Sequence, residues 1–173
     1  MTGGDPNGKW IALTGSDYSG YSGTPEWTVQ GKNSVYINHW KKGGLVTLNW
    51  WPDNPWTQNV YDAYIPAGNH LSDLYTPGNS VYTRWISYLN IKAIELDDLQ
   101  QNGVVVLWRP FHEMNGNWWW WANQDQAEFI ALYQHMFNYF TYTKHLNNLL
   151  WVYGPNHYYG SYKSAEYYYP GDT

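Results

Sequence analysis

Residues 104–118 have the sequence VVVLWRPFHEMNGNW, and this stretch determines the fold that we expect. Its first five residues, Val104 to Trp108, are apolar without alternation, which is typical of a strand buried on both faces of a parallel sheet. The residues from Arg109 onward follow the strand directly and include a cation, a histidine and a carboxylate. Active sites of α/β proteins form where parallel strands end. We therefore expect a functional site immediately after this strand.

Other strands and helices alternate along the chain. Three further short apolar runs, bounded by Gly, Asn or Pro, predict strands at Trp10–Thr14, Leu45–Trp50 and Leu149–Tyr153. Helical periodicity predicts helices at Ser34–Lys42, Ser80–Gln101 and Asp125–Lys144. Gly43 and Gly103 follow the first two helices, at the position where a left-handed residue ends a helix. This alternation predicts parallel strands joined by right-handed crossovers.

The loops are long after strands and short before them. The long loops, residues 15–33, 51–79, 109–124 and 154–173, are rich in Trp, Tyr, Asn and Gly. This asymmetry is typical of a (β/α)8 barrel, and a complete barrel needs about 200–250 residues. A doubly wound sheet is the alternative, but no glycine-rich phosphate loop follows any strand. We therefore predict an α/β fold, a partial (β/α)8 TIM barrel with about four parallel strands and intervening helices.

The composition excludes several classes of protein. A net charge of −5 argues against a nucleic-acid partner, and the lack of cysteine excludes a disulfide scaffold and a thiol nucleophile. No apolar run is long enough to span a membrane, and no signal peptide is visible. Aromatic residues make up 20% of the chain. Trp and Tyr combine a flat apolar face with a polar edge, which suits carbohydrate, although most single tryptophans belong to protein cores.

Glu113 is the candidate catalytic residue. A carboxyl group at the end of a barrel strand, beside the wall of Trp118 to Trp121, can protonate a leaving oxygen. The structural alternative is an ion pair between Glu113 and Arg109. A zinc site is not expected, because HExxH needs a second histidine where this chain has Gly116. No Gly-x-Ser-x-Gly motif is present, so a serine nucleophile is not expected either.

Residues 109–118, RPFHEMNGNW, resemble the acid/base signature of glycoside hydrolase family 26, which β-mannanases typify. Three other regions agree in order and spacing: HWKKGGLVTLNWWPDNPW (39–56), FIALYQHMFNYF (129–140) with NNLLWVYGPN (147–156), and YYPGD (168–172). The resemblance implies a secreted, endo-acting, retaining hydrolase of β-1,4-mannan on a (β/α)8 barrel. It implies no cofactor and no metal, a polysaccharide as partner, and neither nucleic acid nor membrane.

The resemblance also implies roles for individual residues. Glu113 becomes the general acid/base, His112 contacts the sugar at the cleavage point, and Trp118 stacks on a sugar ring. The further substrate-binding candidates are Arg109, Asn115, Trp51 and Tyr158. The family's nucleophile lies on a late barrel strand, and none of Asp17, Asp53, Glu166 and Asp172 stands in a motif of that kind. We therefore expect residues 1–173 to be one incomplete catalytic domain, truncated before the late barrel strands and inactive alone.

Three alternatives remain open at this stage. Trp51 stands where many family mannanases have a histidine, so β-glucan or xylan is an alternative substrate to mannan. A noncatalytic, aromatic-rich carbohydrate-binding half-barrel would retain the cleft without a nucleophile. Self-association through exposed barrel edges would cover the apolar surface that an open sheet leaves.

Overall fold

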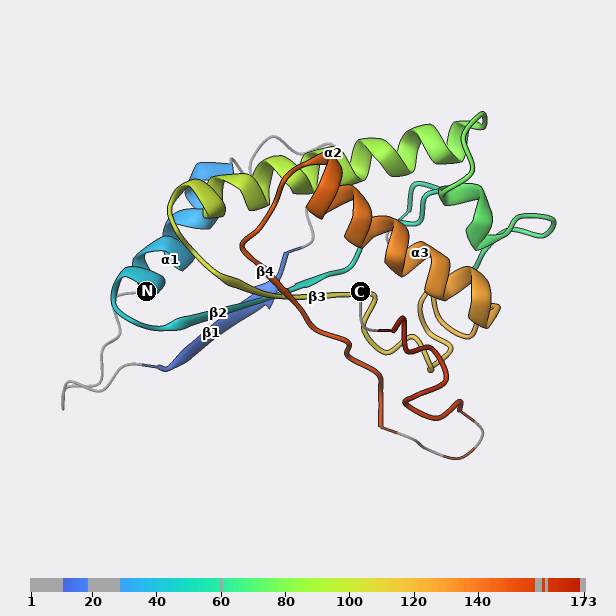
Figure 1. Cartoon of the computed structure of the whole chain (residues 1–173). Coiled ribbons are helices and arrows are strands. Elements are labelled where there is room, and N and C mark those ends of the chain that lie inside the picture. The colour runs from blue at the N-terminus through green and yellow to red at the C-terminus, as the bar shows by residue number, and fades with distance from the viewer. Residues whose placement is uncertain (1–10, 19–28, 60, 158–159, 161, 172–173) are drawn as a thin grey trace.

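The computed structural model describes residues 11–18, 29–59, 61–157, 160 and 162–171. Four parallel strands form one sheet in the order β1-β2-β3-β4 (Figure 1). The strands are β1 (Leu13–Asp17), β2 (Leu45–Trp50), β3 (Val106–Pro110) and β4 (Leu149–Trp151). The predicted parallel α/β fold is confirmed. The prediction for β2 is exact, whereas β1 and β3 begin later in the chain than predicted and β4 ends earlier.

The helices connect these strands in the predicted alternation. They are α1 (Val29–Lys41), a short 3-10 helix η1 (Leu71–Leu74), α2 (Ser80–Gln101) and α3 (Gln126–Asn138), and α3 continues into a π-helical turn, η2 (Tyr139–Thr143). The Asn79 side chain accepts a hydrogen bond from the backbone of Tyr82 and starts α2, and Asp125 starts α3 in the same way. Gly103, with φ of +71°, ends α2 as predicted. No helix in the described ranges is long and apolar enough for a membrane span.

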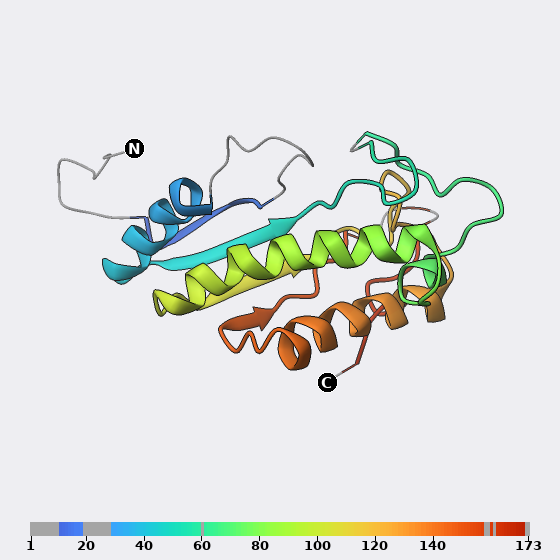
Figure 2. The ribbon, with the colours of Figure 1, turned by 90° about the horizontal axis from the view of Figure 1, so that it is seen from above.

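The helices α1, α2 and α3 lie on the same side of the sheet, as Figures 1 and 2 show. The side chains that face them are buried: Val46, Leu48 and Trp50 of β2, and Val106, Trp108 and Pro110 of β3. The alternate residues of β3, Leu107 and Arg109, are only half-buried. The prediction that this strand is buried on both faces is therefore wrong. Among the described residues, no helix covers the second face.

Tryptophans fill the core between the sheet and the helices. The ring of Trp50 stacks on Trp85 of α2 at 5.5 Å and on Trp108 at 6.1 Å between centroids. Trp85, Trp108, Trp120 and Trp121 are each at most 1% exposed. A large share of the aromatic content therefore stabilises the fold by burial rather than lining a binding surface.

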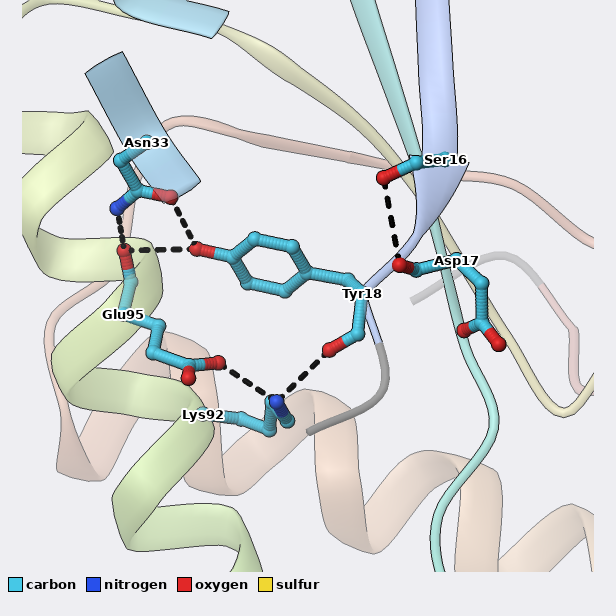
Figure 3. Close-up of polar contacts among 6 residues, drawn as sticks. All are labelled: Ser16, Asp17, Tyr18, Asn33, Lys92 and Glu95. Atoms are coloured by element: carbon cyan, nitrogen blue, oxygen red, sulfur yellow. Dashed lines mark hydrogen bonds and ion pairs between the residues drawn. The ribbon is translucent and has the colours of Figure 1, made fainter. Parts of the chain in front are cut away.

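A buried polar cluster fixes the end of β1 to α2 (Figure 3). The Tyr18 hydroxyl donates to Asn33 Oδ1 at 2.6 Å, and Lys92 Nζ donates to the Tyr18 carbonyl at 2.7 Å. Lys92 also forms an ion pair with Glu95 at 2.6 Å. These contacts satisfy polar groups that burial would otherwise leave without partners. The end of β1 is consequently held against α1 and α2.

Candidate active site

Glu113 lies in a tight turn that follows β3 directly. Phe111 and Glu113 both have left-handed backbone conformations, with φ of +49° and +58°. Such conformations are uncommon for residues other than glycine and cost about 1–3 kcal/mol each, so surrounding contacts must hold them. Glu113 donates its backbone N–H to the Gly154 carbonyl at 2.8 Å, and its own carbonyl accepts from Gly116 at 2.9 Å. The turn buries Phe111 in the core and leaves Glu113 half-buried.

Among the described residues, the Glu113 carboxylate has one specific partner, which is Trp118. The indole Nε1 of Trp118 donates to Glu113 Oε2 at 2.8 Å. Gly116 makes this approach feasible, because a Cβ at that position would lie 2.5 Å from the Trp118 ring. The Trp118 ring also contacts the ring of Tyr162, with 5.5 Å between centroids and an angle of 83° between the ring planes. Trp118 is therefore held by its polar edge as well as by its ring.

His112 lies beside Glu113 among tryptophan rings. Its ring centroid is 5.5 Å from that of Trp119 and 5.9 Å from that of Trp121. Burial, and secondly the positive charge of Arg109, lower the pKa of His112 below its ordinary value. The imidazole is therefore neutral near pH 7. Its Nδ1 atom is buried and has no hydrogen-bond partner within the described part of the chain.

Arg109 belongs to a polar row across the sheet. The strand register aligns Asp17 of β1 with Asn49 of β2, and Asn49 with Arg109 of β3. Lys92 and Glu95 form an ion pair, and His70 contacts Glu128. Arg109 and Glu113 are both described and no ion pair joins them, so the structural alternative for Glu113 is not formed. A Cβ at Gly154 would lie 2.8 Å from Arg109 Cδ, so this glycine makes room for the arginine.

Trp51 extends the aromatic wall on the β2 side of the site. Its ring meets the edge of Trp119 at 4.2 Å, and Trp119 stacks on Trp121 at 5.3 Å. The indole of Trp120 donates to the Pro52 carbonyl at 3.0 Å, which ties the loops after β2 and β3 together. The structure thus brings four of the predicted site residues, Arg109, His112, Glu113 and Trp118, to the end of β3, and Trp51 contacts the same tryptophan cluster.

Two other residues predicted to bind substrate, Asn115 and Tyr158, are not among the residues that the structure places at the site. Asn115 is 1% exposed, and its amide forms hydrogen bonds with the backbone of Asn156 and Lys163, contacts that the sequence did not predict. No local sequence pattern signals such partners, since they lie about forty residues away. Tyr158 lies outside the described residues.

The other acidic residues do not gather into a metal site. Asp53 is 7% exposed, Glu166 lies in an exposed turn, and Asp172 lies outside the described residues. Within the described residues, no group of three or more His, Asp or Glu side chains could hold a metal ion. The chemistry that the arrangement supports is proton transfer by a carboxyl group next to aromatic surfaces.

Known proteins of one family match the chain. The model of glycosyl hydrolase family 26 matches residues 7–173. Mannan endo-1,4-beta-mannosidase A and B of Caldalkalibacillus mannanilyticus is 38% identical over 151 residues, which are 82% of this chain and 29% of that protein. This chain thus spans about a third of the length of such relatives.

Solved structures of similar proteins share the fold. GH26A from Muricauda sp. superposes with a TM-score of 0.79 at 29% identity, covering 92% of this chain and 55% of that one. The β-mannanase from a symbiotic protist of the termite Reticulitermes speratus, complexed with gluco-manno-oligosaccharide, has a TM-score of 0.74 at 30% identity. That match covers 93% of this chain and 52% of the protist enzyme.

Proposed function

The chain belongs to glycosyl hydrolase family 26, and on that basis we propose that it forms the acid/base half of an endo-acting, retaining hydrolase of β-1,4-mannan. The observation that carries the proposal is the placement of the Glu113 carboxylate at the end of β3, within 2.8 Å of the Trp118 indole nitrogen. The names of the relatives, mannan endo-1,4-β-mannosidases, support mannan as substrate.

Glu113 acts twice in the proposed reaction. As an acid it protonates the glycosidic oxygen while the bond to the anomeric carbon breaks, and a second carboxylate attacks that carbon. As a base the same group then takes a proton from the water that hydrolyses the glycosyl-enzyme. The nucleophile comes from a part of the barrel outside residues 1–173. Since Trp118 binds Oε2, the Oε1 atom of Glu113 is the one that delivers the proton.

The neighbouring side chains bind the sugar in this proposal. The neutral imidazole of His112 can exchange a hydrogen bond with a sugar hydroxyl. Trp118 and Trp51 offer ring surface, Arg109 offers donors at the end of its strand, and Tyr158 belongs to the sequence segment after β4. The reaction uses two carboxyl groups and requires neither cofactor nor metal. We place the enzyme outside the cell, because polymeric mannan cannot cross a membrane.

Binding of oligosaccharides to this chain tests the proposal directly. Calorimetric titration with mannohexaose should show binding that Glu113→Gln retains, since the amide oxygen still accepts from Trp118, and that Trp118→Ala weakens. Tyr142→Ala is the matched control, because Tyr142 is an exposed aromatic residue, 65% exposed, in η2 at the far end of α3. Tighter binding of cellohexaose or xylohexaose would show that the substrate is glucan or xylan instead of mannan. Binding of none of the three sugars would contradict the proposal.

Catalysis requires a complete barrel. We would join residues 1–173 to the remaining half of the termite-symbiont mannanase, whose structure superposes on this chain. The chimera should hydrolyse mannan, and Glu113→Gln should abolish this activity. Full activity of the Glu113→Gln chimera would exclude Glu113 as the acid.

A further inference from the structure

The loop that carries Glu113 and the loop after β4 meet at one buried amide. Asn115 Nδ2 donates to the carbonyl of Asn156 at 3.0 Å and to the carbonyl of Lys163 at 3.0 Å. Asn115 Oδ1 accepts the backbone N–H of Asn156 at 2.7 Å. The side chain is 1% exposed, so water does not compete for these bonds. One amide group therefore joins three backbone groups of the second loop.

These contacts lead back to Glu113 by two routes. The first is the backbone, because Glu113 donates its N–H to Gly154, two residues before Asn156. The second passes through side chains, since Lys163 follows Tyr162, and the Tyr162 ring packs edge-on against Trp118, which binds the Glu113 carboxylate. Movement of the second loop would therefore change both the backbone and the carboxylate of Glu113.

The conformation of Glu113 makes such support necessary. A left-handed backbone at a glutamate persists only where its surroundings determine it. Catalytic groups must also be held close to their productive geometry by residues whose own positions are fixed. The three hydrogen bonds of Asn115 use both donors of its amide and one acceptor site, which gives this side chain a single orientation.

We propose that Asn115 is a positioning residue that holds the backbone of Asn156 and Lys163 against the turn of Glu113 and so keeps the Trp118–Glu113 hydrogen bond in place. The proposal rests on the acid/base role of Glu113. It assigns Asn115 the function of supporting Glu113 through buried hydrogen bonds, instead of the direct sugar contact expected from the sequence.

The indole N–H signal of Trp118 in the NMR spectrum of the full chain tests the proposal without sugar or turnover. Trp118→Phe assigns the signal by its loss. The signal should shift between acidic and neutral pH, and Glu113→Gln should remove that shift, which separates it from any effect of His112. Asn115→Ala should reduce the shift at least about twofold, because the hydrogen bond to a charged acceptor depends on geometry.

Asn148→Ala is the matched control. Asn148 is also a buried asparagine, 8% exposed, and its amide donates to the Val104 carbonyl at the opposite end of β4. This variant should keep the full pH-dependent shift of the Trp118 signal. An unchanged shift in folded Asn115→Ala, or an equal loss in Asn148→Ala, would overturn the proposal.

A second measurement needs no variant and covers the case in which Asn115→Ala does not fold. The amide protons of Glu113 and Asn156 should exchange with solvent at similar rates and through the same opening as denaturant is added, because Asn115 links their loops. Independent opening of the two amides would overturn the proposal. Failure of the proposed function is distinguishable, since it would appear as a lack of oligosaccharide binding with the NMR response intact.

Discussion

The indole nitrogen of Trp118 donates a hydrogen bond to Oε2 of Glu113 over 2.8 Å, so the residue expected to stack on sugar also binds the candidate acid. The stacking surface of Trp118 and the proton donor Glu113 are therefore not independent. A variant that removes the indole changes both the sugar surface and the electrostatic surroundings of the carboxylate. Hydrogen bonds to charged groups contribute about 1.5–3 kcal/mol, enough to matter for catalysis.

Replacing Trp118 with phenylalanine separates these two effects. Trp118→Phe keeps an aromatic face but removes the N–H, so kcat of the chimera should fall by about 10- to 100-fold with a smaller rise in KM. Trp118→Ala should raise KM as well. Trp56→Phe is the control, because the Trp56 indole nitrogen is buried without a partner among the described residues. Steady-state kinetics with unchanged kcat in Trp118→Phe would show that the hydrogen bond is catalytically neutral.

Local signals in the sequence predicted part of the fold precisely. The bounds of β2 and α2 are those predicted, since glycines and capping residues mark them. The predicted start of β3 at Val104 is wrong because the Val104 amide donates to Leu99 and closes α2, together with a bond from Gly103 to Gln100. The prediction of β1 from an apolar run is also shifted along the chain. The residues of β1, LTGSD, pair with β2 through backbone hydrogen bonds, although few of them are apolar.

The sequence predicted only those residues of the site that lie together in one continuous segment. Arg109 to Trp118 form a continuous motif, so the sequence predicts that its polar residues gather at the end of a strand. The partners of Asn115 come from residues 156 and 163, and periodicity carries no information on contacts at that separation. For the same reason, the periodicity of α2 does not predict which of its residues are buried. Lys92 and Glu95 are buried, with Lys92 bonded to the distant Tyr18 carbonyl, whereas the apolar Ile94 is 64% exposed.

The buried pair of Lys92 and Glu95 should be strongly coupled. Removing one partner, as in Lys92→Met, leaves a buried charge without its counterion and should lower the free energy of unfolding by about 3–5 kcal/mol. The double variant Lys92→Met/Glu95→Leu should recover most of this loss, because no charge is then buried. Urea denaturation of the two single variants and the double variant measures the coupling. Additive losses would mean that the two charges do not stabilise each other in the fold.

The face of the sheet without helices should promote self-association. Leu13, Leu45 and Leu150 are on this face by the strand register and are 45%, 52% and 56% exposed. Contiguous exposed apolar area drives association. Sedimentation of the chain should show dimers or larger species, and Leu45→Ser/Leu150→Ser should shift them toward monomer. Ile94→Ser, on α2 at a position that is 64% exposed, is the control and should leave the distribution unchanged. A monomer at all concentrations would contradict this prediction.

His135 should make stability depend on pH below neutrality. Burial lowers its pKa in the folded state below the ordinary value of 6.5, so the unfolded chain binds more protons in this range. The free energy of unfolding should therefore fall as the pH drops below about 6.5 and level off once it passes the lowered pKa.

His135→Phe should weaken this dependence, because phenylalanine binds no proton. The neighbouring Tyr139→Phe loses a hydrogen bond to Asn90 and serves as the control. It should lower stability by about 1 kcal/mol at every pH without altering the slope. Chemical denaturation between neutral and mildly acidic pH gives both quantities, and an unchanged slope in His135→Phe would contradict the prediction.

Glu113→Ala should affect substrates according to how much their leaving groups need a proton. Mannan has a poor leaving group, and loss of a positioned general acid costs about 10²- to 10⁴-fold in rate. Aryl mannosides with activated leaving groups depart with little protonation, so the chimera carrying Glu113→Ala should retain most of its rate of glycosylation with them. A pre-steady-state burst of phenolate measures that first step apart from the hydrolysis of the glycosyl-enzyme, for which Glu113 acts as the base. Equal losses with mannan and with aryl mannosides in the first step would move the acid to another residue.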